Sequence, residues 1–507
     1  FQHKTPATLA THATTAATTT HDPGHGPAPL TPVMHDLQQR GLLADGLHQA
    51  TVLRVPAELT TDRLTIALQA VVDHHGALRM EAEGDGDDMR LRVRQPATLR
   101  ADDILRHVDV SELDETTMSA LIRDEAADAA SLLSPRAGAV LRVVWFDAGR
   151  HRQGRLLLVA HHLVVDGVSW QILAADLAAA WEALAAGRPP RLEPVATSFR
   201  SWSTALSEAA HDPARVAELP IWQKILAPAD SPPSRYEGAE TVGVLQSVLP
   251  ADTTAGLASV SAAFHADLQD VLLTGLVLAL ARTHCWTGGD GSNDESVFLN
   301  LERHGREADL VPGADLSRTV GWFTSIHPVL LDPGPVDWAE ILGPGPAVGN
   351  VLKRIKEQLR ALPDHGIGYG LLRHLNAETR PVLAACPDPL VTFNYLGRAA
   401  APSGEPWTVA EDDFGRDVNT VRANSLEIDA VVRDDGDESR LVAHWGWDRT
   451  SLSEGDISEL AGTWFRLLEA LIAAARLEGA GGRTPSDLDL ITLTQDDIDQ
   501  LESEWGV

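Results

Sequence analysis

Residues 161–170 read HHLVVDGVSW, and this stretch decides the fold. It follows the apolar run 155–160 and precedes the alanine-rich stretch 174–186. The first has the composition of a buried strand and the second that of a helix. Two adjacent histidines therefore lie where a buried strand ends and a loop begins. At such a position a scaffold can hold a proton-transfer group rigidly beside a cleft.

Histidine is the residue type in this stretch that suits acid–base chemistry. An unperturbed imidazole titrates near neutrality, so it can accept and return a proton at little cost. Side chains alternate along a strand, so His161 and His162 are predicted to point in opposite directions if the strand persists. This divergence disfavours a zinc site made of His161, His162 and Asp166, and we expect no metal.

The composition excludes several classes of protein. The 507 residues, 44% of them hydrophobic, suit two or more packed units. A net charge of -31 leaves no basic excess for nucleic acid or an anionic membrane. The two cysteines, Cys285 and Cys386, form neither a disulfide framework nor a CxxC pattern. No run of 18 apolar residues and no signal-peptide pattern is present, so we expect a cytoplasmic protein.

The hydrophobic periodicity predicts an α/β (α+β) chain whose two halves have similar content. Helices are expected at 62–74, 170–186, 252–264, 268–282, 347–362 and 453–477. Strands are expected at 51–55, 89–93, 139–145, 155–160, 242–248, 297–301 and 391–395, with a strand-rich stretch at 425–447.

Residues 299–307, LNLERHGRE, form a second candidate site. A buried apolar strand runs directly into charge here, which is unfavourable unless a cleft or paired partners receive these groups. Taken alone, the stretch is best explained as a surface ion-pair cluster of Glu302, Arg303, Arg306 and Glu307.

Three more stretches stand out: TVGWFTSIHP at 319–328, LPDHGIGYGLLR at 362–373 and FNYLG at 393–397. The glycines at 366, 368 and 370 indicate an unusual backbone path. They do not form a dinucleotide fingerprint, because the spacing is GxGxG and no strand runs into them.

These motifs, in this order, resemble those of the condensation-domain superfamily of nonribosomal peptide synthetases. HHxxxDG at 161–167 is similar to the superfamily signature. The VSW extension at 168–170, GWFT, PxxGxGYG and FNYLG resemble the epimerization branch. So does ERHGRE at 302–307, where that branch has EGHGRE and this chain has Arg303. The resemblance covers about residues 30–490.

The resemblance implies two chloramphenicol-acetyltransferase-like lobes that form a V with a central tunnel. It implies an epimerase that inverts the α-carbon, L to D, of an aminoacyl or peptidyl thioester tethered to a peptidyl carrier protein by phosphopantetheine. No cofactor of its own is implied, because the carrier's arm delivers the substrate. The expected setting is antibiotic or other secondary metabolism. The expected partners are an upstream carrier domain on the same polypeptide and a downstream condensation domain, and the domain itself is expected to be monomeric.

Resemblance and composition together predict the domain boundaries. Residues 1–11 resemble the last helix of a carrier domain, and 12–29 have the composition of a linker. The boundaries that follow are an N-terminal lobe at 30–225, a linker at 226–241, a C-terminal lobe at 242–483 and an acidic tail at 484–507.

By the same resemblance, His162 is the catalytic histidine and Glu302 the second acid or base, while Asn394 and Tyr395 would hydrogen-bond the thioester carbonyl as it gains charge. Whether one base or two act is left open. The expected supporting residues are His161, Asp166, Gly167 and Arg306. The expected tunnel or substrate residues are Ser169, Trp170, Trp322, Phe323 and Tyr369. A second doublet, His74–His75, is expected to pack and cap a helix.

Two alternatives remain. A condensation domain shares the HHxxxDG motif and would form a peptide bond between two carrier-bound substrates. A non-catalytic docking platform shares the fold but tends to lose the histidine motif, which is intact here. Activity with one loaded carrier and no acceptor separates the three.

Overall fold

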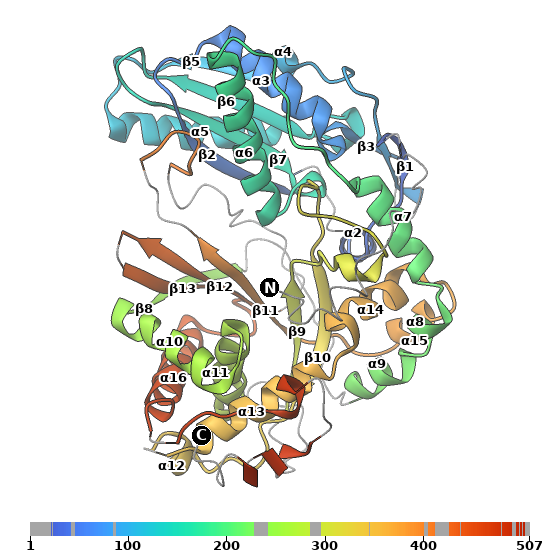
Figure 1. Cartoon of the computed structure of the whole chain (residues 1–507), viewed down its shortest axis with the longest axis vertical. Helices are drawn as coiled ribbons and strands as arrows, with labels where there is room; N and C mark the ends of the chain where they lie inside the picture. The colour runs from blue at the N-terminus through green and yellow to red at the C-terminus, as the bar shows by residue number, and fades with distance from the viewer. Residues whose placement is uncertain are drawn as a thin grey trace. The chain divides into compact units, whose positions relative to one another are not determined.

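The computed structural model describes residues 22, 24–41, 46–84, 88–227, 242–283, 296–343, 345–399, 404–410, 425–436, 438–477, 479–488, 493–495, 497, 498, 500 and 501 (Figure 1). The predicted carrier remnant at 1–11 and most of both predicted linkers lie outside the described residues. The chain divides into two compact units. Unit 1 comprises Phe1–Asp212, His304–Thr324 and Pro402–Thr420, and unit 2 comprises Pro213–Arg303, Ser325–Ala401 and Val421–Val507.

The units differ from the two contiguous lobes expected from the sequence. Residues 213–225 belong to unit 2, while 304–324 and 404–410 belong to unit 1. Long-range contacts decide this division: the bridge between Leu53 and Val409 joins the segment 404–410 to unit 1. Contacts of this kind leave no local mark in the sequence.

The main sheet of unit 1 has the order β2-β7-β6-β5. Its strands are β2 (His48–Val55), β7 (Gly154–His161), β6 (Leu141–Asp147) and β5 (Leu105–Asp109). Strand β7 is antiparallel to both neighbours, and all eight of its residues are buried. Other elements therefore cover β7 on both faces, and its C-terminal end is a rigid support for the residues that follow it.

Three long helices pack around this sheet (Figure 1). Helix α5 (Glu115–Ser131) contributes Met118 and Ile122 to an apolar cluster with the strands. Helices α3 (Thr61–His74) and α6 (Gly167–Ala185) pack against each other. The side chain of Thr60 caps α3 by accepting a hydrogen bond from the Arg63 amide.

A second sheet of unit 1 has the order β1-β4-β3, formed by β1 (Gly26–Ala28), β4 (Arg90–Val93) and β3 (Met80–Glu83). Strand β1 lies inside the predicted linker 12–29, so part of that segment is folded. Pairing uses backbone groups, and a Gly-Pro-Ala stretch can therefore occupy the edge of a sheet. The other α-helices in the described part of unit 1 are α2 (Pro32–Gln39), α4 (Ala101–Ile104) and α7 (Phe199–Ala209).

Unit 2 is built on a six-stranded mixed sheet of order β10-β9-β11-β12-β13-β8. The strands are β10 (Ser325–Leu331), β9 (Val297–Arg303), β11 (Val391–Ala399), β12 (Leu426–Asp435), β13 (Glu438–Asp448) and β8 (Val242–Leu249). Strand β11 runs parallel to both β9 and β12. Parallel pairing points the C-terminal ends of β9 and β11 toward the same edge of the sheet.

The core of unit 2 lies between this sheet and its long helices. These are α10 (Ala251–Phe264), α11 (Leu268–Thr283), α13 (Ala347–Arg360) and α16 (Glu454–Ala474) (Figure 1). Shorter α-helices in the described part of this unit include α8 (Pro213–Val216), α9 (Leu219–Ile225), α12 (Trp338–Ile341), α14 (Ile367–Gly370) and α15 (Arg380–Ala384). Among the described helices, none is by itself long and apolar enough to cross a membrane, and the pair α10 and α11 meets that test jointly while bent by 104°.

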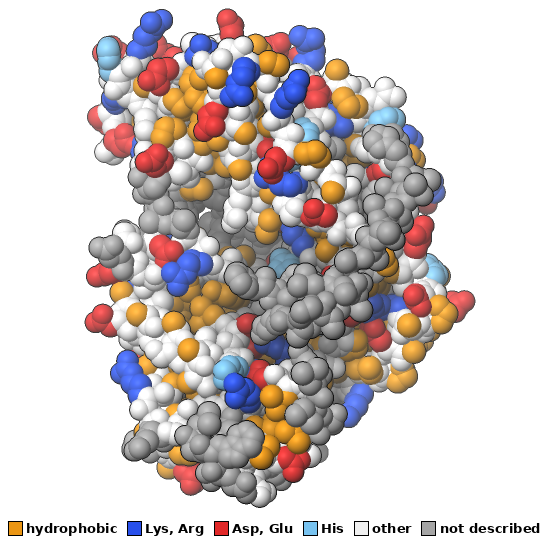
Figure 2. Space-filling view, in the orientation of Figure 1, with side chains coloured by type: hydrophobic (Ala, Val, Ile, Leu, Met, Phe, Trp, Pro, Cys, Tyr) orange, Lys and Arg blue, Asp and Glu red, His pale blue; other side chains and the backbone are white. Residues whose placement is uncertain are grey.

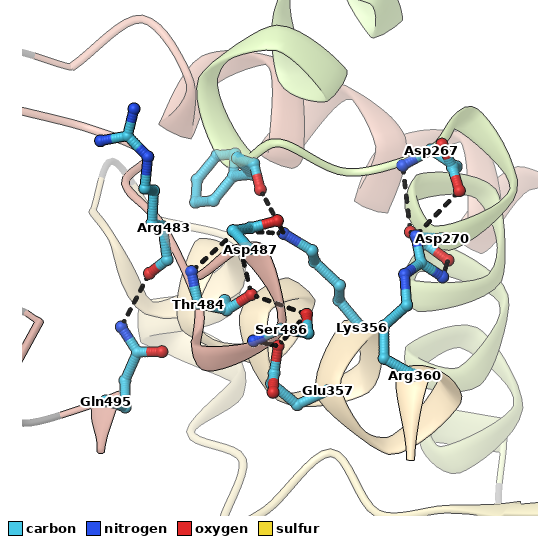
Figure 3. Close-up of polar contacts among 11 residues, drawn as sticks. Asp267, Asp270, Lys356, Glu357, Arg360, Arg483, Thr484, Ser486, Asp487 and Gln495 are labelled. Atoms are coloured by element: carbon cyan, nitrogen blue, oxygen red, sulfur yellow. Dashed lines mark hydrogen bonds and ion pairs between the residues drawn. The ribbon is translucent and has the colours of Figure 1, made fainter. Parts of the chain in front are cut away.

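The beginning of the predicted acidic tail is docked onto unit 2 (Figure 3). Lys356 of α13 is 1% exposed, and its ammonium donates to both carboxylate oxygens of Asp487, at 2.8 and 2.7 Å, and to the Phe264 carbonyl at 3.2 Å. Burial alone would raise the pKa of Asp487, but hydrogen bonds from Lys356 and the Thr484 amide hold it below its ordinary value. Residues 484–488 are therefore part of the fold.

The surface charge is mixed on the face drawn in Figure 2, where acidic and basic side chains are interspersed. The excess of acidic residues behind the net charge of -31 is thus not gathered there into one patch.

Candidate functional site

The two histidines of HHxxxDG lie at the end of β7, as the sequence predicts. His161 is the last strand residue, is 1% exposed, and accepts a hydrogen bond from the Leu163 amide at Nδ1. His162 opens the short 3-10 helix His162–Val164 and is half-buried. Its ring stacks on Trp322, with centroids 4.0 Å apart and planes inclined by 24°.

Three hydrogen bonds define the protonation state of His162. Its Nδ1 lies 2.9 Å from the Val165 carbonyl, which only accepts, so Nδ1 carries the hydrogen. Its Nε2 lies 3.0 Å from the Gln49 amide nitrogen, which only donates, so Nε2 presents its lone pair. The Trp170 indole N–H donates to the Gln49 amide oxygen at 2.9 Å, and this orients the amide. The imidazole is neutral, and Nε2 is its basic atom.

The surroundings of His162 favour this neutral form. Burial lowers its pKa below the ordinary value of 6.5, while hydrogen bonds to backbone groups of His162 and Val165 and the charge of Asp166 act in the opposite direction. At neutral pH the ring is therefore mainly unprotonated. A base in this state is ready to accept a proton.

Asp166 shapes the loop after the histidines. It caps α6 by accepting hydrogen bonds from the Ser169 amide at 2.8 Å and the Ser169 hydroxyl at 2.7 Å. Its two oxygens also face Arg306 at 3.0 and 3.1 Å. Arg306 in turn donates to the carbonyls of Leu316 at 3.0 Å and Thr319 at 2.7 Å. Gly167 is the exposed first residue of the helix.

The GWFT motif packs onto this loop. The Ser169 hydroxyl lies 3.0 Å from the Gly321 carbonyl and accepts from the Gly321 amide at 3.1 Å. The Arg306 guanidinium lies 3.9 Å from the centroid of the Phe323 ring. Gly321 has no room for a side chain, because a Cβ there would come within 2.2 Å of Phe199. Unit 1 thus brings together HHxxxDG, GWFT and Arg306, the second arginine of ERHGRE.

The Arg306→Ala variant is expected to be destabilised by about 3–5 kcal/mol, because Asp166 would keep a buried charge without its partner. Thermal denaturation should show a fall in the midpoint of roughly 10 °C. The double variant Asp166→Asn/Arg306→Met should recover part of the loss, since neither charge is then left behind. Arg188→Ala, on an exposed arginine of the same unit, is the control. An unchanged midpoint in Arg306→Ala would show that the ion pair contributes nothing.

In unit 2, the glutamate of ERHGRE meets the asparagine of FNYLG. Glu302 of β9 is in register with Asn394 of β11, and the Asn394 amide donates to a Glu302 carboxylate oxygen at 3.0 Å. Both side chains are half-buried. Arg303, at the next strand position, points to the opposite face of the sheet. The sequence motif predicts neither the register nor this hydrogen bond.

The two tyrosines expected near the substrate, Tyr395 and Tyr369, both belong to unit 2. Tyr395 alternates with Asn394 along β11, and its side chain packs against the apolar core of this unit. Burial raises its pKa above 10.0, with Arg398 acting in the opposite direction. Tyr369 is 7% exposed and lies 5.5 Å, between ring centroids, from Trp222 in an apolar cluster. Both tyrosines thus contact apolar side chains of this unit, whereas Asn394 hydrogen-bonds Glu302. The place of the tyrosines near the substrate stays a prediction.

The boundary between the two units falls inside ERHGRE. Glu302 and Arg303 end a strand of unit 2, whereas Arg306 belongs to unit 1. Arg306 pairs with Asp166, so a surface cluster of the four charged residues does not describe this motif. The Gly366 turn does follow the expected unusual path, with φ +87°.

One group among the described residues brings metal-ligand atoms within 4.8 Å of one another: His74, His75 and Asp176. His75 bonds Asp176 at 2.7 Å, and the other Asp176 oxygen is paired with Arg318. The His74 ring lies 2.7 Å from the Glu193 carbonyl. Burial lowers the pKa of His75, which is also the C-cap of α3. The packing and capping roles expected for this doublet account for these contacts.

The sequence model of the family described as Condensation domain matches residues 37–486. The chain belongs to the condensation-domain family. This condensation domain is 33% identical to chondramide synthase cmdD of Chondromyces crocatus, over 100% of the chain and 13% of that protein. It is 34% identical to one of the proteins that make up the linear gramicidin synthase of Brevibacillus parabrevis, over 94% of the chain and 9% of that protein. It therefore spans about a tenth of the length of these relatives.

Among solved structures, the condensation domain resembles the epimerization domain from the third module of tyrocidine synthetase B. The TM-score is 0.71 at 26% identity, and the match covers 89% of this chain and 98% of that one. The expected fold class is confirmed: the chain has a mixed α/β fold of two chloramphenicol-acetyltransferase-like lobes. Domains of this family act on substrates tethered to carrier domains by phosphopantetheine.

Proposed function

We propose that this member of the condensation-domain family is an epimerase, which inverts the α-carbon of an aminoacyl or peptidyl thioester on the phosphopantetheine arm of a carrier domain. The hydrogen bond between Asn394 and Glu302 carries the proposal, because it joins two motifs that resemble the epimerization branch. The likeness to a solved epimerization domain at 26% identity supports the same choice.

The chemistry needs only proton transfer. A thioester acidifies the α-hydrogen, so a neutral imidazole can act on it without a metal. His162 removes the α-proton at Nε2, and the electron pair of the C–H bond passes to the thioester oxygen as an enolate. Reprotonation of the α-carbon on its other face then gives the D configuration. The protonated carboxyl of Glu302 supplies that proton in the two-base form of the proposal.

The proposal implies partners in a larger assembly. The substrate would arrive on an upstream carrier domain of the same polypeptide, and the product would pass to a downstream condensation domain. The assembly would be a nonribosomal peptide synthetase of antibiotic or secondary metabolism. The long synthases that this chain matches over a tenth of their length support this setting.

The test presents the chain, in heavy water, with a carrier loaded with an L-aminoacyl or peptidyl thioester. The product is released and analysed for α-deuterium and for chirality. Deuterium together with an L/D mixture is the expected result. Retained hydrogen and pure L product across several substrates would overturn the proposal. In that case, peptide formation after addition of a second, acceptor-loaded carrier identifies a condensation domain, and no reaction identifies a docking platform.

A further inference from the structure

A chain of three side chains leads from helix α6 to the basic atom of His162. The Trp170 indole donates to Gln49, and Gln49 donates to His162 Nε2. We propose that Gln49, oriented by Trp170, is a positioning residue that keeps Nε2 of His162 deprotonated and covers its lone pair until substrate displaces the amide. This inference rests on the proposed function, in which Nε2 is the base.

The geometry of an imidazole nitrogen limits what can contact Nε2 of His162. An unprotonated ring nitrogen has one lone pair, which lies in the plane of the ring and accepts one hydrogen bond. Gln49 occupies that direction at 3.0 Å. The α-hydrogen of a substrate has to approach along the same direction, so the amide has to move aside before proton transfer. Gln49 thus protects the base without being a proton donor in the reaction.

Trp170 decides which end of the amide faces His162. An indole N–H can only donate, so it selects the oxygen of Gln49 and turns the amide nitrogen toward the imidazole. Protonated His162 would carry a hydrogen on Nε2 and meet another donor there. Rotation of the amide would relieve this conflict, but it would set the amide nitrogen against the Trp170 N–H. Trp170 therefore works against protonation of His162 through Gln49.

In the described part of unit 1, we consider three other titratable groups near Trp170, Gln49 and His162. Asp166 acts on His162 from the following loop, and its charge is paired with Arg306. His161 precedes it on β7, in register with His48 of β2. None of these contacts depends on the Gln49 amide, so changes at Gln49 or Trp170 leave them in place.

The test is a titration of His162 by nuclear magnetic resonance of histidine-labelled protein, with the His162→Ala spectrum for assignment. Wild-type His162 should show the tautomer with hydrogen on Nδ1 and titrate below pH 6.5. In Trp170→Phe the amide can rotate freely, and the midpoint should rise by about half to one pH unit, the size expected from one hydrogen bond. In Gln49→Glu the added carboxylate should raise it by about one unit or more.

Two matched variants control for general effects. Trp181→Phe removes an indole from the same helix, and Gln171→Glu adds a charge at an exposed position of that helix. Both should leave the midpoint of His162 unchanged. A wild-type tautomer with hydrogen on Nε2, or equal midpoints in wild type and Trp170→Phe, would overturn the inference.

The same variants separate this inference from the proposed function. The acid limb of the α-hydrogen exchange rate should move with the midpoint of His162, toward higher pH in Trp170→Phe. If the resonance shifts appear but the chain exchanges no α-hydrogen, the proposed function fails and the network stands. If exchange occurs while the titration midpoint of His162 is unchanged in Trp170→Phe and Gln49→Glu, the network fails and the proposed function stands.

Discussion

The His162→Ala variant is expected to exchange the α-hydrogen of a carrier-bound thioester about a thousandfold more slowly than the wild type, the loss typical of a removed general base. The cause is specific, because the substitution removes the Nε2 lone pair and the stacking on Trp322 but leaves the ion pair of Asp166 with Arg306. The measurement is deuterium incorporation at the α-carbon in heavy water under single-turnover conditions.

The matched control is His211→Ala, which removes an exposed histidine from the same unit. Added imidazole should restore part of the exchange in His162→Ala, since it can occupy the vacated site as a free base, and should not accelerate the control. Exchange near the wild-type rate in His162→Ala would exclude this residue as the base.

The Glu302→Gln variant is expected to separate inversion from exchange. If Glu302 delivers the second proton, inversion of an L substrate should fall by about a hundredfold or more, whereas its exchange at His162 should fall less. With a D substrate, Glu302 is the group that removes the proton, so exchange and inversion should fall together. Chiral analysis and deuterium content of the same released product provide both numbers.

Glutamine is the right replacement because its amide oxygen can still accept from Asn394. Glu469→Gln, on the exposed face of α16, is the control for loss of one negative charge in unit 2. Equal losses of exchange and inversion from both enantiomers would assign all proton transfer to one base. Loss of activity together with loss of the fold would instead make Glu302 a structural group.

The regular elements of this chain can largely be predicted from local patterns. Helix α3, strand β7 and helix α6 appear within a few residues of the expected ranges, because their apolar residues repeat at the period of the element. Helix α5 is absent from the predicted elements, since its buried face mixes Met118 and Ile122 with a glutamate and two alanines, so its hydrophobic periodicity is weak. Strand β1 is absent from them too, because backbone pairing alone forms it.

The site is predictable only as far as short motifs reach. The motifs identify His162, Asp166, Glu302 and Arg306. They do not predict the pairing of Arg306 with Asp166, because the two residues are 140 positions apart and nothing local connects them. The FNYLG motif groups Tyr395 with Asn394 as neighbours in sequence, whereas strand alternation turns Tyr395 to the other face. Gln49 has no signal at all, because an isolated glutamine on a strand becomes meaningful only through the histidine and tryptophan it meets in space.

The discontinuous make-up of unit 1 has a consequence for how the chain folds during synthesis. Its first part ends at Asp212, yet the loop that carries Arg306 and the segment with Val409 emerge from the ribosome much later. At ordinary translation speeds the delay from residue 212 to 410 is roughly 10–40 s. We expect the nascent strand β2, which bonds the late segment, to stay sensitive to protease until that segment appears. Unit 1 is thus the first to be synthesised in part, but it cannot complete its fold until residues up to 410 have emerged.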